Sequence, residues 1–97
     1  MTPTERTIIR ETLRRHFPEA APFLFGSRAT GTGWRYSDCD IYLDTEDDRE
    51  TSVIAKAVEG AREEFADSRL PFVVDIFHPA LLKGSFLASF QNDLQPL

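Results

Sequence analysis

The chain has a single cysteine, Cys39, and only two lysines, Lys56 and Lys83, among its 97 residues. One cysteine excludes an intrachain disulfide, so we expect the protein to be cytoplasmic. Long apolar runs are also missing. No stretch approaches the length of a membrane span, and residues 1–6 lack the apolar core of a signal peptide, so no membrane association is expected.

Basic residues are outnumbered, with 11 Lys and Arg against 16 Asp and Glu, and the net charge is −5. Nucleic-acid backbones are bound through many Lys and Arg contacts, so no nucleic-acid partner is expected. A nucleotide is not excluded, because metal ions can neutralise its few phosphates. The length and the 41% hydrophobic content predict one globular domain over residues 1–97. Its core is thin, so we expect it to associate with a partner chain.

Hydrophobic periodicity predicts alternating helices and strands. Thr2-Pro3-Thr4-Glu5 is a helix start with a capping box, and Pro18 and Pro22 end that helix. This order of elements predicts an α+β two-layer fold, with a small mixed sheet of about three strands covered by helices. The later elements are expected as a strand over 22–25, a short helical turn within 26–33, a strand over 38–43, a loop over 45–49, a helix over about 50–68, a strand over 72–77 and a helix from 80 to about 94.

Three aspartates stand where strands would carry apolar residues. Asp38 and Asp40 share one face of a predicted strand, with Cα atoms about 6.6 Å apart. Asp75, in an otherwise apolar strand, could join them from a neighbouring strand about 4.8 Å away. Each pair of carboxylates at roughly 5 Å costs on the order of 3 kcal/mol. Protonation, an arginine or divalent cations could offset this repulsion, and oxygen ligands favour two Mg²⁺ ions, or Mn²⁺. A lone Asp-x-Asp is more often a strand end or a solvated edge.

A glycine-serine turn precedes these aspartates by ten residues. Gly26 would let the backbone approach a ligand closely, and Ser27 adds a hydroxyl donor at the start of a short helix. Arg28 could reach an outer phosphate. Taken alone, the turn is more often a structural helix entry. Beside the aspartates, it would hold a triphosphate next to the cations that neutralise it.

Residues 24–29 (Leu-Phe-Gly-Ser-Arg-Ala), 37–41 (Ser-Asp-Cys-Asp-Ile) and 74–76 (Val-Asp-Ile) together resemble the signature of the polymerase-β-like nucleotidyltransferase superfamily. Within that superfamily the chain resembles the minimal nucleotidyltransferases, the MntA-like antitoxins often encoded beside a HEPN-domain toxin. The resemblance covers nearly the whole chain and implies a nucleotidyltransferase fold. All three acidic positions are present. The helical domain of larger relatives is not seen, so we expect either that a partner or a second copy supplies the missing walls of the site or that the base is held loosely.

The resemblance also implies roles. Gly26 and Ser27 would hold the β- and γ-phosphates of ATP, and Asp38 and Asp40 would bind both metal ions. Asp75 would bind one ion and orient or deprotonate the attacking hydroxyl. In the MntA-like group that hydroxyl belongs to a tyrosine of the HEPN toxin, and AMP is transferred. The alternatives are an antitoxin that neutralises its toxin by binding alone and a nucleotidyltransferase that modifies a small molecule.

Other side chains are open to two interpretations. Arg35 either steers the triphosphate or is solvated. Trp34 and Tyr36 could stack on a base or contact a partner, although partial burial is expected. His78 is expected to cap the last helix and His16 to be structural. Cys39 is expected in the core, and the charged residues 44–50 in a solvated loop.

Overall fold

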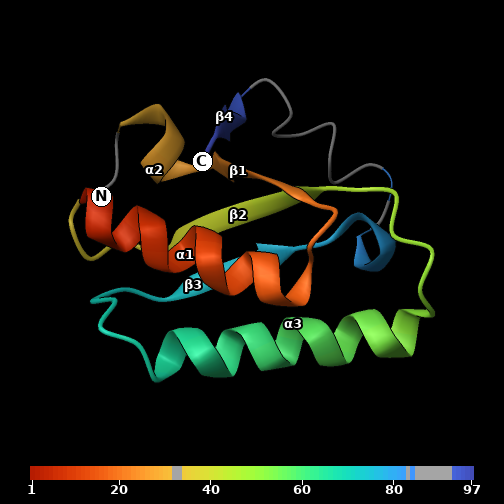
Figure 1. The fold of residues 1–97 in the computed structure, drawn as a ribbon. Helices are drawn as coiled ribbons and strands as arrows, with labels where there is room; N and C mark the ends of the chain where they lie inside the picture. The colour runs from red at the N-terminus through yellow and green to blue at the C-terminus, as the bar shows by residue number, and fades with distance from the viewer. Residues whose placement is uncertain (32–33, 83, 85–92) are drawn as a thin grey trace.

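The computed structural model describes residues 1–31, 34–82, 84 and 93–97 (Figure 1). Four strands form one sheet in the order β3-β2-β1-β4, in which β2 and β3 are parallel and the other neighbours antiparallel. The predicted α+β fold with a mixed sheet is confirmed, with β4 as an additional strand. In chain order the elements are α1 (Pro3–His16), β1 (Ala21–Phe25), α2 (Ser27–Thr30), β2 (Cys39–Asp44), α3 (Thr51–Ala66), β3 (Val74–Phe77), the 3₁₀ helix η1 (Pro79–Leu81) and β4 (Gln95–Pro96).

The first helix begins as the sequence predicts. The Thr2 hydroxyl accepts a hydrogen bond from the Glu5 backbone N–H at 3.1 Å, and the Glu5 carboxylate accepts one from the Thr2 N–H at 2.9 Å. This reciprocal pair satisfies donors that the helix itself cannot. The helix ends at His16, two residues before Pro18.

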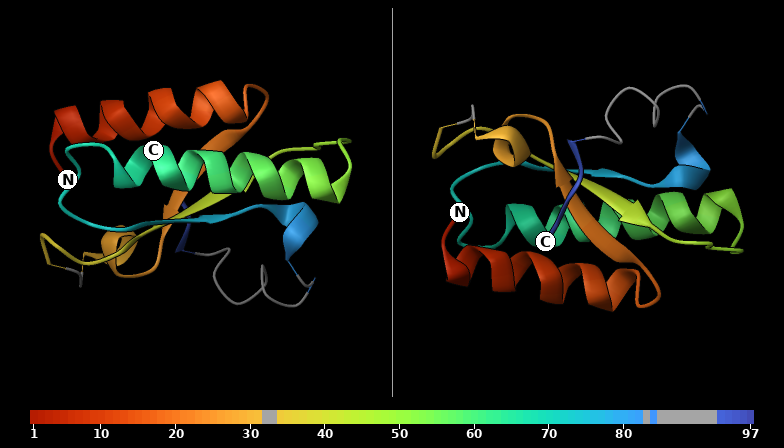
Figure 2. Two further views of the ribbon diagram at one scale, coloured as in Figure 1. Left: turned by 90° about the horizontal axis from the view of Figure 1, so that it is seen from below. Right: turned by 90° about the horizontal axis from the view of Figure 1, so that it is seen from above.

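Helices α1 and α3 lie side by side over one face of the sheet (Figures 1 and 2). Strand alternation directs Cys39, Ile41 and Leu43 into the core between the helices and the sheet, where they are 0% exposed. Cys39 is therefore a core residue, as expected, and burial raises the pKa of its thiol to about 12. Among the described residues, no helix is both long and apolar enough to span a membrane.

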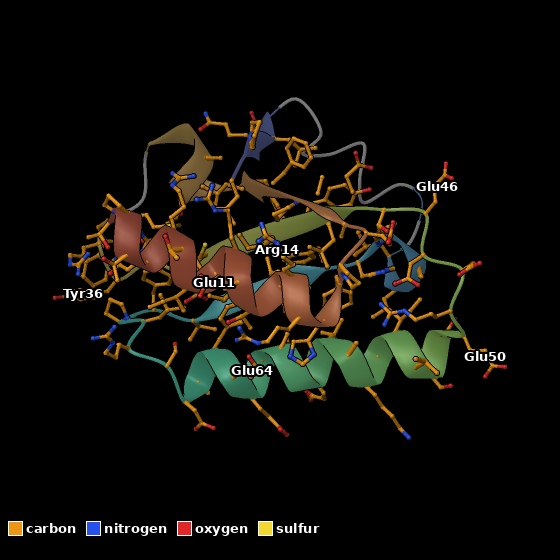
Figure 3. The ribbon with its side chains drawn as sticks, viewed as in Figure 1. Glu11, Arg14, Tyr36, Glu46, Glu50 and Glu64 are labelled. Carbon is orange, nitrogen blue, oxygen red and sulfur yellow. The ribbon has the colours of Figure 1, made fainter. Side chains whose placement is uncertain are left out.

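A polar contact joins the two helices on the outside of this core. Glu64 of α3 accepts hydrogen bonds from Arg15 at 2.6 Å and from His16 at 2.7 Å (Figure 3). A Cβ atom at Gly60 would lie 3.0 Å from the His16 ring, so this glycine allows the close approach. The expected structural role of His16 is confirmed.

Several predicted boundaries are displaced. Strand β2 begins at Cys39 rather than Asp38, and β3 begins at Val74 because residues 71 and 72 form bends before the ladder starts. Of the helix predicted over residues 80–94, residues 83 and 85–92 lie outside the described part. At its start the chain forms η1, which His78 caps by accepting a hydrogen bond from the Ala80 N–H at 3.1 Å.

The loop between β2 and α3 is not wholly solvated, contrary to expectation. The side chain of Asp47 is 9% exposed and accepts hydrogen bonds from Arg49 at 2.6 Å and from the buried His78 at 3.1 Å. His78 Nδ1 accepts a hydrogen bond from a backbone N–H, so the ring proton is on Nε2. That Nε2–H group donates the hydrogen bond to Asp47. Hydrogen bonds from Arg49 and His78 hold the pKa of Asp47 well below its usual range.

Replacing Asp47 by alanine is expected to lower the free energy of unfolding by about 2–3 kcal/mol, since His78 would lose its acceptor inside the protein. Asp48→Ala, at the exposed neighbouring position, removes the same charge and should change stability by less than about 0.5 kcal/mol. Urea unfolding of both variants measures the difference. Equal stabilities would show that the Asp47 contacts do not hold the loop.

Candidate active site

The sheet register places two of the predicted site residues side by side. Asp40 of β2 is paired with Asp75 of the parallel strand β3 and, on its other side, with Phe25 at the end of β1. Residues paired across a sheet share a face, so these three side chains project from the face opposite α1 and α3. The alternation of β2 and β3 that buries Ile41 and Ile76 thus brings both carboxylates to the other surface.

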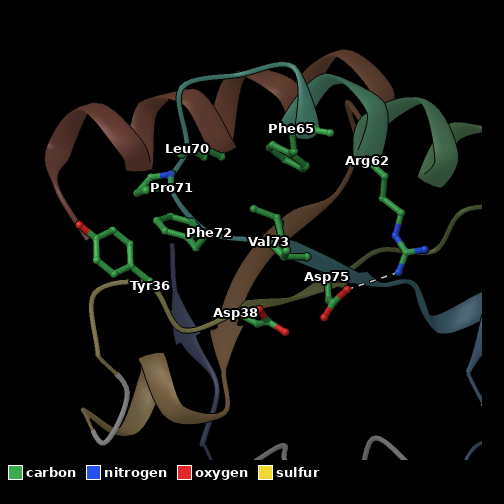
Figure 4. Close-up of a pocket in the computed structure, with 11 residues that line it drawn as sticks. Tyr36, Asp38, Arg62, Phe65, Leu70, Pro71, Phe72, Val73 and Asp75 are labelled. Carbon is green, nitrogen blue, oxygen red and sulfur yellow. Dashed lines mark hydrogen bonds and ion pairs between the residues drawn. The ribbon is translucent and has the colours of Figure 1, made fainter.

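Asp38 joins them from the segment just before β2. It is exposed, whereas Asp40 is half-buried. The pKa of Asp40 is raised above its ordinary value, first by burial and then by the negative charges of Asp75 and Asp38. All three carboxylates therefore occupy one neighbourhood, and Figure 4 shows Asp38 and Asp75 beside each other on adjoining segments.

An arginine partly offsets this concentration of negative charge. Arg62 of α3 donates to Asp75 across 3.4 Å from Nη2 to Oδ1. The sequence indicates only that Arg62 lies on the solvent side of its helix. Its proximity to Asp75 depends on how α3 crosses β3, which no local pattern reveals.

Gly26 lies directly against Asp40. Its backbone has φ 73° and ψ −153°, a region open essentially to glycine alone. A Cβ atom at this position would be 2.8 Å from Asp40 Oδ2. The turn that was predicted to approach a phosphate is therefore within contact distance of the carboxylate cluster.

Arg28 follows this turn and binds backbone atoms. Its Nε and Nη2 atoms donate to the Ser37 carbonyl at 3.1 and 2.9 Å, and Nη2 also donates to the Arg35 carbonyl. The guanidinium lies 4.2 Å from the centre of the Phe72 ring. Arg28 thus ties the glycine turn to the segment before Asp38 and to the approach to β3. Its contact with a phosphate stays a prediction.

The loop before Asp38 is also tied to α1. Arg35 donates to Glu5 across 3.1 Å from Nη2 to Oε2 and so takes part in a structural ion pair. Trp34 and Tyr36 are 68% and 52% exposed, so the expected partial burial is wrong. Their rings pack edge to face at 5.4 Å. Contact with a base or a partner stays a prediction for both.

A pocket of about 700 Å³ opens beside the carboxylates. Asp38 and Asp75 line it with Val73 next to them, Phe65 and Leu70 lie further away, and Arg62 extends from α3 toward Asp75 (Figure 4). The pocket is large enough for part of a nucleotide or an acceptor side chain.

The donor chemistry of the cluster suits a hard divalent cation. Three carboxylates supply only oxygen ligands, and a cation would relieve the repulsion that raises the pKa of Asp40. As they stand, no three acidic, histidine or cysteine side chains in the described ranges are gathered to hold a metal ion. Binding therefore requires the carboxylates to turn toward one another and Asp75 to exchange its arginine partner.

The raised pKa of Asp40 predicts a stability effect. The folded state binds this proton more tightly than the unfolded state, so protonation stabilises the fold below an ordinary aspartate pKa of 3.8. The stabilisation is lost as the pH rises through the raised value. In the presence of a chelator, Asp40→Asn should be more stable than the parent at pH 7, and the difference should shrink toward acid pH. Denaturant unfolding across this range measures it, and a difference independent of pH would contradict the assignment.

Comparison with known proteins identifies the family of this chain. The sequence pattern of the nucleotidyltransferase domain matches residues 6–93. Among solved structures, the chain is similar to one described as the crystal structure of the toxin-antitoxin with AMP-PNP. The TM-score is 0.64 and the identity 23%, over 90% of this chain and 76% of that one, which shows a shared fold. A comparison with curated proteins gives no match. Because the family pattern covers most of the sequence, the chain belongs to the nucleotidyltransferase domain family, consistent with the minimal nucleotidyltransferase predicted from its motifs.

Proposed function

We propose that this chain is a Mg²⁺-dependent nucleotidyltransferase that transfers AMP from ATP to a hydroxyl group of a partner protein. The observation that carries the proposal is the close approach of Gly26 to Asp40, where a Cβ atom would lie 2.8 Å from Oδ2, beside Asp38 and Asp75. It supports a phosphate-binding turn and a cation-binding cluster within a single site.

The resemblance to the polymerase-β-like nucleotidyltransferases suggests a role for each residue, and the chemistry of each side chain suits that role. Ser27 and backbone N–H groups of the turn bind the β- and γ-phosphates, which places the α-phosphorus near the carboxylates. Asp38, Asp40 and Asp75 would hold the cations, which would supply positive charge to the triphosphate and to the leaving group. The acceptor oxygen attacks the α-phosphorus, the bond to the bridging oxygen breaks, and pyrophosphate leaves with the electron pair. Asp75 orients the acceptor hydroxyl and receives its proton.

The proposed acceptor is a tyrosine of a HEPN-type toxin, for which this chain serves as antitoxin. The resemblance to MntA-like proteins supports this choice, and so does the similar structure described as a toxin-antitoxin with AMP-PNP. The exposed Tyr36 and Val73 line the pocket beside the carboxylates and offer an apolar rim to a partner. The proposal includes a location in the cytoplasm and one domain over residues 1–97.

Two labels on ATP test the reaction. The purified chain is incubated with a HEPN-type toxin, Mg²⁺ and ATP labelled at either the α- or the γ-phosphorus. Transfer of the α-label alone to the toxin is expected, with loss of transfer in the presence of a chelator. Transfer of the γ-label would indicate phosphorylation and would overturn the proposed reaction.

The second candidate is an antitoxin that acts by binding alone. The Arg62–Asp75 ion pair favours it, since an arginine already offsets part of the charge of the aspartates. In that case neither Mg²⁺ nor ATP would shift the unfolding temperature, and toxin neutralisation would survive loss of the aspartates. A joint shift by both ligands would favour the enzyme.

A further inference from the structure

The ion pair between Arg62 and Asp75 links α3 to the carboxylate cluster. Arg62 Nη2 lies 3.4 Å from Asp75 Oδ1, at the rim of the 700 Å³ pocket (Figure 4). The Arg62 side chain is 50% exposed and that of Asp75 is 32% exposed. In the described part of the chain, Asp75 is the one acidic residue that forms an ion pair with Arg62.

The position of this pair matters because Asp75 has two competing uses. Its charge adds to those on Asp38 and Asp40, which raises the pKa of Asp40. Without a cation, a guanidinium beside Asp75 lowers the cost of holding three carboxylates together. With a cation, the same Asp75 oxygens are needed as ligands, so the arginine has to withdraw.

The geometry allows such an exchange. A half-exposed pair at 3.4 Å is held weakly, because water screens it and the long arginine side chain loses rotamer freedom to form it. Arg62 can turn into solvent without opening the core, since its side chain is exposed at the edge of the apolar stripe and the buried side chains of Val58, Ala61 and Phe65 hold the helix in place.

We propose that Arg62 is a positioning residue that holds Asp75 in the cation-free protein and competes with a divalent cation for that carboxylate. The inference rests on the proposed function, because it requires the aspartates to bind a cation. It adds a residue of α3 that sets the affinity of the carboxylate cluster for a divalent cation. Arg62 keeps the cluster intact while no cation is present, and it weakens binding of the cation that replaces it.

Mn²⁺ binding measures this competition without any catalytic turnover. Free Mn²⁺ is followed by electron paramagnetic resonance as it is titrated into the parent, Arg62→Met and Arg62→Lys. Methionine keeps the apolar stem and removes the charge, whereas lysine keeps the charge. We expect Arg62→Met to bind Mn²⁺ about tenfold more tightly than the parent, and Arg62→Lys to stay close to the parent. The gain should shrink at high ionic strength, because salt screens exposed charges.

Two controls separate competition from other effects. Arg14→Met removes an exposed charge from the outer side of α1 (Figure 3) and should leave Mn²⁺ affinity unchanged. In an Asp75→Asn background, Arg62→Met should no longer increase the affinity, since the shared carboxylate is gone. Circular dichroism and thermal unfolding confirm that each variant is folded.

The outcomes distinguish this inference from the proposed function. Equal, measurable affinities of the parent and Arg62→Met would overturn the role of Arg62 and leave the cation site standing. A gain that persists in the Asp75→Asn background would also overturn it, because general charge would then be the cause. Absence of Mn²⁺ binding in both the parent and Arg62→Met would overturn the cation site itself and with it the inference.

Discussion

An Asp40→Asn variant is expected to transfer AMP at least about a thousand times more slowly than the parent. Asp40 lies between Asp75 and the Gly26 turn, so its carboxylate is the one placed to bind cations and approach the phosphates together. Neutral asparagine is a poor ligand for Mg²⁺, and loss of metal-ion stabilisation costs several kcal/mol of activation free energy. The rate is measured as label transferred from α-labelled ATP to a HEPN-type toxin.

The matched control is Asp44→Asn. Asp44 lies on the same face at the far end of the same strand, is exposed, and pairs with Ala21 at the start of β1. The same change there should leave the rate within about a factor of two, because it touches neither the turn nor the cluster. If both variants retained transfer, Asp40 would have no part in the chemistry, and the binding-only antitoxin would be favoured.

Gly26→Ala is expected to lower both stability and activity. The added Cβ would lie 2.8 Å from Asp40 Oδ2, and the backbone there adopts φ 73° and ψ −153°. An L-residue in this region costs about 1–3 kcal/mol, and the contact adds to that cost. Any relaxation moves either the turn or the carboxylate, so we expect transfer to fall about a hundredfold or more.

Gly31→Ala provides the comparison. Gly31 also has a positive φ of 78°, but a Cβ atom there would meet nothing within 4 Å. This variant carries backbone strain of about 1 kcal/mol without the contact to Asp40, and its transfer rate should stay near that of the parent. Urea unfolding and label transfer are measured on both variants. Equal losses of activity would mean that strain in this region, rather than the approach to Asp40, explains the effect.

Local signals account for much of what the sequence predicts correctly. The first helix was predictable because Thr2, Pro3 and Glu5 specify its start within four residues. The location of Asp40 and Asp75 on one face of the sheet was also predictable from local patterns. Alternation separates Asp40 from its buried neighbours, and an acidic residue in the apolar strand around Asp75 needs an exposed face.

Features that depend on tertiary contacts were not predictable. Strand β4 has two residues, one of them a proline, and exists because Gln95 pairs with Leu24 of β1. The Arg62–Asp75 pair depends on the crossing of α3 over β3. The burial of Asp47 depends on the position of His78, which follows the end of β3 and contacts the Asp47 carboxylate. Arg28 was expected at a phosphate, yet its guanidinium donates to carbonyl groups of a loop whose path no pattern in the sequence reveals.

The most direct test is a crystal structure of the protein with Mn²⁺ and a non-hydrolysable ATP analogue, in which anomalous scattering locates the metal. Our account predicts manganese bound by Asp38, Asp40 and Asp75 at about 2.0–2.3 Å, with the triphosphate against the Gly26-Ser27 turn. Manganese or nucleotide bound elsewhere, with the three carboxylates free of both, would contradict it.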